Sequence, residues 1–258
     1  MFIIKAILIA ISMYSALPMP QFEWSEKPMR YAIAFFPFVG IVTGGLFYLW
    51  FLLCGSFGIP DAVRTGVAAA LPVLVTGGIH IDGFMDTTDA LRSYQSREKR
   101  LDILKDPHIG AFAVIGVLTY FILLLSGLSV LNMTDATILA GGFVLARSFS
   151  GLSVATFRNA KGEGSLYAFS SGLSKRVTIF ILLTELVLSS VFMIWVNPLR
   201  GGVAVAVALC VFVYYRFRSY RVFGGITGDL AGWFLCLAEI GMVLGLAALR
   251  IGLPEQVL

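Results

Sequence analysis

Residues 109–131 read IGAFAVIGVLTYFILLLSGLSVL, a run of 23 residues without a charged side chain. The hydrocarbon core of a bilayer is about 30 Å thick, and a helix needs about 20 predominantly apolar residues to cross it. The run is long enough for this, so it predicts a membrane-spanning helix.

The composition extends this prediction to the whole chain. Of its 258 residues, 58% are hydrophobic and 13% are charged, and the mean hydropathy is +0.89. A soluble domain usually has about 25% charged residues. These values indicate an integral membrane protein in contact with the lipid bilayer, and they exclude a disordered chain.

Seven apolar stretches are candidates for membrane spans. The sixth is short, and no internal repeat relates one part of the chain to another. We therefore expect an all-α, polytopic bundle of about seven transmembrane helices. The candidate spans are residues 31–54, 62–79, 109–131, 136–157, 177–196, 201–215 and 231–250.

The basic residues are distributed unequally between the two sides of such a bundle. Seven spans place residues 18–30, 80–108, 158–176 and 216–230 on one side, with fourteen basic residues. The other side has Arg64, Arg200 and Arg250. Lysine and arginine are enriched in cytoplasmic loops, so the four segments are predicted to be cytoplasmic. The net charge of +4 is explained by this orientation, and no nucleic-acid partner is expected. The fourteen residues are Lys27, Arg30, Arg92, Arg97, Lys99, Arg100, Lys105, Arg158, Lys161, Lys175, Arg176, Arg216, Arg218 and Arg221.

An acidic motif opens the second of these cytoplasmic segments. Residues 76–93 read TGGIHIDGFMDTTDALRS, with Asp82, Asp86 and Asp89 spaced four and three residues apart. On a helix this spacing places the three carboxylates on one face, where they repel one another. A hard divalent cation removes the repulsion, and magnesium is typically bound by one or two carboxylates together with substrate phosphates. The motif predicts a Mg²⁺ or Mn²⁺ site with Asp82, Asp86 and Asp89 as ligands and catalytic residues.

Two points about the motif stay open at this stage. An acidic helix start stabilised by the helix dipole is the simpler alternative to a metal site. His80 is a candidate catalytic residue that would bind phosphate or transfer a proton, or it caps the helix.

Further candidate phosphate contacts lie on the same side. Arg100 and Lys105 follow the acidic motif, and their alternative role is that of ordinary inside-positive charges. Asp229 lies in the glycine-rich turn GGITGDLAG at residues 224–232. Glycine lets backbone N–H groups approach a phosphate closely, so this turn is a further candidate for substrate binding.

Arg147 lies inside a predicted span, where an ionisable side chain is costly in lipid and should face the bundle interior. It either reaches a substrate phosphate or pairs with Glu239 or Glu185.

Three stretches of the chain resemble motifs of the cobalamin synthase family, the adenosylcobinamide-GDP ribazoletransferases. They are TGGIHIDGFMDTTDA at residues 76–90, LDILKDPHIGAF at 101–112 and GGITGD at 224–229. SALPMP at residues 15–20 and FPFVGIVTGG at 36–45 are also similar to that family. The resemblance covers nearly the whole chain, with the motifs in the same order.

The resemblance implies a magnesium-dependent transferase of cobalamin biosynthesis, with residues 1–258 as a single integral-membrane catalytic domain. The expected substrates are adenosylcobinamide-GDP and α-ribazole or α-ribazole 5′-phosphate. The products would be adenosylcobalamin or its 5′-phosphate, together with GMP. The implied location is the bacterial or archaeal cytoplasmic (inner) membrane, with cytoplasmic active-site loops, where the enzyme would associate with other late corrin-pathway enzymes.

Two alternatives fit the sequence less well. CDP-alcohol phosphotransferases also have spaced aspartates at a membrane face, but their DGxxAR motif needs Ala-Arg where this chain has Asp86-Thr87. A secondary transporter would bury ionisable residues midway through the bilayer and often shows repeated halves. Here the most distinctive charges lie at the membrane face, and no repeat is found.

Overall fold

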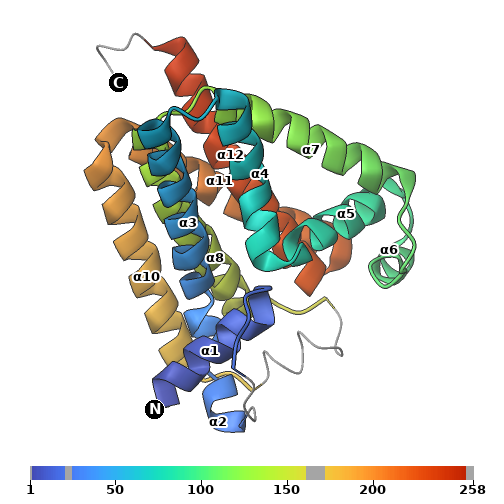
Figure 1. Ribbon diagram of the computed structural model, residues 1–258. Coiled ribbons are helices and arrows are strands. Elements are labelled where there is room, and N and C mark those ends of the chain that lie inside the picture. The colour runs from blue at the N-terminus through green and yellow to red at the C-terminus, as the bar shows by residue number, and fades with distance from the viewer. Residues whose placement is uncertain (1, 21–24, 161–171, 254–258) are drawn as a thin grey trace.

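The protein is described by a computed structural model that covers residues 2–20, 25–160 and 172–253 (Figure 1). Lys161, one of the predicted cytoplasmic basic residues, lies outside these ranges. Regular structure in the described ranges is helical, apart from an isolated parallel bridge between Asn159 and Ile226. The predicted all-α class is confirmed.

In the described ranges, six helices are long and apolar enough to cross a membrane, which makes the chain a multi-pass membrane protein. The first of them combines the short helix η1 (Ala32–Phe35) with α3 (Pro37–Phe57). The other five are α7 (Ala111–Ser129), α8 (Met133–Thr156), α10 (Lys175–Val196), α11 (Pro198–Phe223) and α12 (Gly228–Gly252).

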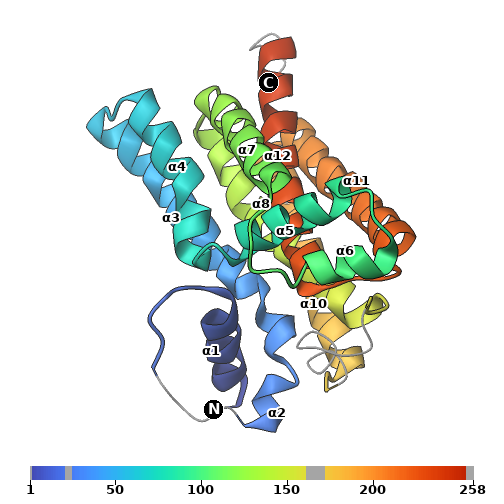
Figure 2. The same cartoon turned by 90° about the vertical axis from the view of Figure 1, so that its right-hand side faces the viewer.

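The predicted span at residues 62–79 is not a straight helix. Helix α4 (Asp61–Thr76) is followed by α5 (Ile79–Arg92), and the two are bent by 94° at the break between them. The number of spans becomes seven, as predicted, if this pair is counted as one. The 16 residues of α4 are about 24 Å long at about 1.5 Å per residue, which is less than the hydrocarbon thickness. Helix α5 therefore begins before the level at which the longer helices end, and it runs across the bundle (Figures 1 and 2).

The predicted span at residues 201–215 is also too short. Helix α11 continues to Phe223, past three arginines that the sequence places in a loop. The Arg216 guanidinium lies 4.8 Å from the ring centroids of both Phe157 and Tyr220, which are cation–π contacts. These contacts hold the charged last turns of α11 in helical form beyond the apolar segment.

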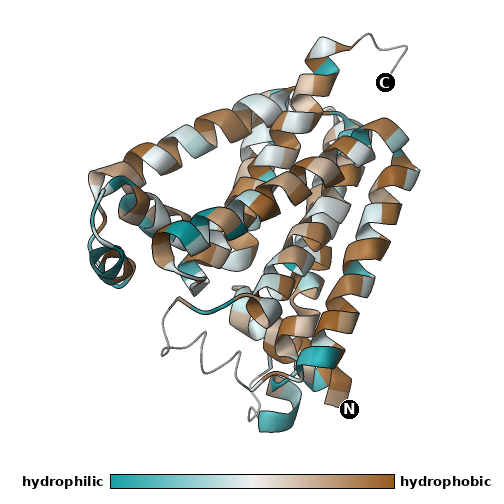
Figure 3. Ribbon diagram, turned by 180° about the vertical axis from the view of Figure 1, so that it is seen from behind, coloured by the Kyte–Doolittle hydropathy of each residue, from teal (hydrophilic) through white to brown (hydrophobic). Residues whose placement is uncertain are grey.

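Helix α8 lies in the centre of the bundle, where 83% of its spanning window is buried. It packs against α3, α10 and α12. The outer helices α7 and α10 expose large apolar side chains such as Ile122 and Phe180, which are 64% and 71% exposed. Figure 3 shows this hydrophobic surface, with hydrophilic residues gathered at α6 (Arg97–Ile103) and α2 (Glu26–Met29). An exposed apolar surface of this extent is suited to lipid contact.

Helix α1 (Phe2–Tyr14) has 13 residues and is too short to cross a bilayer. It packs against η1, α2 and α3, and it buries Ala6, Ile9 and Ala10. The loop that follows reaches the end of α4, where the Ala16 backbone N–H donates to the Val75 carbonyl.

Candidate active site

The acidic helix is positioned by two consecutive glycines. Gly77 and Gly78 have φ angles of 66° and 83°, in the left-handed region that side chains disfavour. They end α4 and start α5 in a new direction. The GG pair thus produces the bend that places the acidic motif across the end of the bundle.

A close contact between helices brings another acidic residue to α5. A Cβ added to Gly83 would lie 2.7 Å from the Asp229 carbonyl oxygen and 2.9 Å from its Cα, so only glycine permits this approach of α12. Further along the same crossing, a Cβ on Gly232 would lie 3.2 Å from the His80 backbone. The glycine that follows Asp82 is therefore a packing residue between α5 and α12.

Asp229 lies in the first turn of α12, next to the carboxylates of α5. Thr227 caps this helix by accepting from the Leu230 N–H, and its hydroxyl also donates to Asp229 Oδ2 at 3.2 Å. The pKa of the Asp86 carboxyl is raised to about 6 by burial and then by the charges of Asp82, Asp229 and Asp89. Asp229, predicted as part of a phosphate-binding turn, is thus a fourth member of the acidic cluster.

The carboxylates of Asp82, Asp86 and Asp229 have the chemistry of a hard-cation site, since oxygen ligands from one or more carboxylates suit Mg²⁺. The charges of Asp82 and Asp229 both act on Asp86, and a bound cation would reduce this repulsion. As they stand, no three His, Cys, Asp or Glu side chains in the described ranges already converge on one metal position.

Asp89 has a structural contact that differs from the predicted role of metal ligand. Its Oδ2 accepts from the Gly110 N–H at 2.7 Å, and its Oδ1 accepts from the Ala113 N–H at 2.8 Å. Both donors belong to the start of α7, whose first backbone N–H groups have no partner within the helix. Asp89 therefore caps α7 from another helix, and Asp229 is better placed than Asp89 to complete the acidic site.

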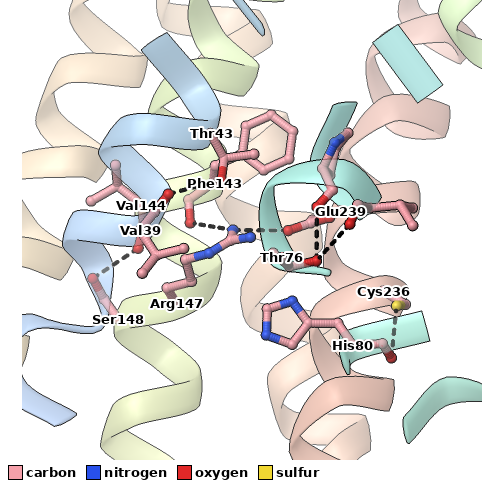
Figure 4. A network of polar contacts seen from close by, with 12 residues as sticks. Val39, Thr43, Thr76, His80, Phe143, Val144, Arg147, Ser148, Cys236 and Glu239 are labelled. Carbon is pink, nitrogen blue, oxygen red and sulfur yellow. Dashed lines mark hydrogen bonds and ion pairs between the residues drawn. The ribbon is translucent and has the colours of Figure 1, made fainter. Parts of the chain in front are cut away.

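His80 faces away from the carboxylates. At about 100° per residue it lies about 160° round α5 from Asp82. It is 9% exposed, and its ring contacts the Phe36 ring edge-on at a centroid distance of 6.0 Å. It lines a small cavity of about 30 Å³ inside the bundle, and its carbonyl accepts from Cys236 Sγ (Figure 4). This position does not support the predicted catalytic role for the His80 side chain.

Arg147 is fully buried in the bundle. Its Nη1 donates to Glu239 Oε1 at 2.9 Å and to the Phe143 carbonyl at 3.0 Å (Figure 4). The structure therefore shows the ion pair with Glu239, one of the two predicted alternatives, and not a guanidinium open to the membrane face.

The predicted phosphate contacts Arg100 and Lys105 lie at α6 and just after it. Lys105 is exposed and Arg100 is half-buried. The neighbouring Asp106 carboxylate accepts from the His108 ring at 2.7 Å.

Two other basic residues hold the turn before Asp229, and one of them, Arg97, is a further phosphate contact that the sequence suggested. Arg158 Nε donates to the Gly224 carbonyl at 2.9 Å. Arg97 Nη2 donates to the Ala160 carbonyl at 3.1 Å, beside the bridge between Asn159 and Ile226. The pair fixes the segment that leads into α12, and so positions Asp229.

Comparisons with known proteins identify the family of this chain. A family model described as cobalamin-5-phosphate synthase matches residues 6–247. The adenosylcobinamide-GDP ribazoletransferase of Lachnoclostridium phytofermentans is 41% identical over 255 residues, which cover 99% of this chain and 96% of that protein. Proteins of the same name from Clostridium perfringens and Pseudomonas fluorescens are each 32% identical, over 93% of this chain and 96% and 98% of their own lengths. No solved structure matches. The chain therefore belongs to the cobalamin-5-phosphate synthase family.

Proposed function

We propose that this protein joins adenosylcobinamide-GDP to α-ribazole or α-ribazole 5′-phosphate and releases GMP. The products are adenosylcobalamin or its 5′-phosphate. Family membership supports the substrates. The observation that carries the chemistry is the meeting of Asp82 and Asp86 with Asp229 at the Gly83 crossing of α5 and α12.

Asp82, Asp86 and Asp229 are the proposed ligands of Mg²⁺. Burial raises the pKa of Asp86, and the neighbouring carboxylates raise it further; a divalent cation would relieve their repulsion. Magnesium bound there would supply positive charge to the substrate diphosphate and to the leaving phosphate. Asp89 is assigned to positioning, because its capping of α7 fixes the end of α5.

The reaction exchanges one phosphorus–oxygen bond for another. A ribose hydroxyl of the ribazole, other than the 5′-oxygen that carries the phosphate in α-ribazole 5′-phosphate, bonds through its oxygen to the phosphorus that is attached to the cobinamide arm. The bond from that phosphorus to the bridging oxygen of the diphosphate breaks, and GMP leaves with that oxygen. One of the aspartates accepts the hydroxyl proton, since His80 faces the bundle interior on the other side of α5.

The exposed Lys105 and the half-buried Arg100 are proposed to contact substrate phosphates from α6 and its end. The proposed location is the cytoplasmic membrane of a prokaryote, with the acidic cluster on the cytoplasmic side. The clustering of basic residues on the segments at that end supports this orientation.

The test is GMP release by the purified protein in vesicles with adenosylcobinamide-GDP, α-ribazole and Mg²⁺. Asp82→Asn, Asp86→Asn and Asp229→Asn should each lose at least about 100-fold in kcat, and EDTA should stop turnover reversibly. Asp61→Asn is the matched control, since this exposed aspartate pairs with Arg64 at the other end of α4. Absence of GMP release by folded protein would refute the function. Full activity of Asp229→Asn would refute only its place in the site.

A further inference from the structure

A large groove opens on the side of the bundle between α7 and α11. It has a volume of about 770 Å³, and α5 and α12 form its floor. Figure 2 faces this side and shows α12 behind the space between α7 and α11, with α5 crossing it. The groove therefore opens laterally, between two helices that are long enough to span the membrane.

The lining of the groove changes from cationic and aromatic to apolar along its length. Arg92 and Arg218 lie at the end that carries the basic segments, with Trp233 beside them near the start of α12. Leu244 lies at the other end. The 11 residues from Trp233 to Leu244 correspond to about 16 Å of helix, close to the roughly 15 Å of one hydrocarbon leaflet.

Among the described residues, the two guanidinium groups at this end of the groove have no acidic partner. Neither Arg92 nor Arg218 makes an ion pair within the described ranges, and Arg218 Nε is buried without a hydrogen-bond partner there. The two guanidinium groups are suited to bind an anionic group, and the apolar groove beside them is suited to bind an apolar chain attached to it.

The groove is distinct from the acidic site. Its α5 residues Phe84, Thr88 and Leu91 lie on a different face of that helix from Asp82 and Asp86.

We propose that this groove is a binding site for an anionic phospholipid of the leaflet next to the acidic site. The phosphate of the headgroup contacts Arg92 and Arg218, and one acyl chain lies along α12 between α7 and α11. The lipid closes the lateral opening beside α5, and it binds there in preference to a zwitterionic lipid.

The test uses tryptophan quenching by brominated lipids in vesicles. One variant keeps Trp233 as its only tryptophan, and a second keeps Trp195, which is 79% exposed at the far end of α10. Dibrominated phosphatidylglycerol should quench Trp233 at about a tenfold lower mole fraction than dibrominated phosphatidylcholine. Trp195 should show no such preference.

Arg92→Gln with Arg218→Gln should remove the preference at Trp233, whereas Arg221→Gln should keep it. Arg221 is an exposed arginine of the same last turns of α11 that does not line the groove. Each single variant is measured as well, and helical circular dichroism verifies folding. Equal quenching of Trp233 by both lipids, or a preference that survives the double variant, would overturn the proposal. So would loss of the preference on adding millimolar inorganic phosphate at constant ionic strength, which would indicate a site for free phosphate. The assay does not depend on turnover, so its outcome is separate from that of the proposed reaction.

Discussion

Replacing Gly83 by alanine tests whether the contact between α5 and α12 assembles the acidic site. The added methyl group would lie 2.7 Å from the Asp229 carbonyl oxygen, and ordinary van der Waals contact starts at 3.4 Å. The two helices must therefore separate locally by about 0.7 Å (3.4 − 2.7). The three nearest atoms, the carbonyl oxygen, the Cα and the carbonyl carbon, all belong to the backbone of Asp229, so no side-chain rotation relieves the clash.

The separation should affect activity more than stability. Overpacking costs about 1–3 kcal/mol, and alanine returns about 1 kcal/mol of helix propensity, which leaves a net loss of up to about 2 kcal/mol. A misplacement of about 1 Å costs about 100-fold in rate where geometry is critical. We therefore expect Gly83→Ala to lower kcat by about 10- to 100-fold while the protein still folds.

The assay is GMP release, combined with thermal unfolding in detergent. Gly228→Ala is the matched control, because Gly228 is adjacent to Asp229 and a Cβ there meets nothing within 4 Å. It should keep kcat within about twofold of the wild type. A Gly83→Ala variant with wild-type kcat and an unchanged unfolding temperature would show that the close contact does not position the site.

Three further predictions concern the charged residues. Asp89→Ala should lower the free energy of unfolding by about 0.5–2 kcal/mol, because the α7 cap is lost, and should leave the Mg²⁺ concentration for half-maximal activity unchanged. Asp229→Ala should raise that Mg²⁺ concentration. The opposite result for the two variants would mean that Asp89 is the ligand and Asp229 the structural residue. Arg147→Met should lower the unfolding temperature more than Arg147→Met with Glu239→Gln, because the single change leaves a buried carboxylate unpaired; equal losses would mean that the pair is uncoupled. Because the pKa of Asp86 is raised to about 6 in the folded state, its contribution to stability is present below pH 4 and is lost as the pH rises through 6. Metal-free protein should therefore unfold at a lower temperature at pH 7.5 than at pH 5, and Asp86→Asn should reduce that difference.

The spans were predictable because the membrane imposes a length on each apolar run. Their ends were less predictable. The run at residues 201–215 ends where arginines begin, yet α11 continues to Phe223. Arg216 packs there on Tyr220 of the next turn and on Phe157 at the end of α8. A hydropathy scale reflects the free-energy cost of placing a charge in lipid. It contains no information about the cation–π contacts that stabilise a helix outside the lipid.

The acidic site was predictable in its location and only partly in its members. Local spacing placed Asp82, Asp86 and Asp89 on one helical face, and the structure has them on α5. Asp89 caps α7 because the chain returns to the end of α5 after α6. Asp229 joins the cluster because α12 crosses α5 at Gly83. Neither contact is encoded by spacing within a single motif.

Helix α5 explains why the glycine and the aspartates occur at fixed spacing. Each residue turns the helix by about 100°, so α5 presents the aspartates on one face and Gly83 with His80 towards α12. Phe84, Thr88 and Leu91 lie on a third face, towards the lateral groove. An insertion of one residue before Asp86 would rotate the rest of the helix by about 100° relative to the Gly83 contact. It would turn Asp86 away from Asp82 and Asp229, and at the same time detach Asp89 from the start of α7. The spacing of the motif therefore meets the packing requirements of α5 as well as those of the proposed metal site.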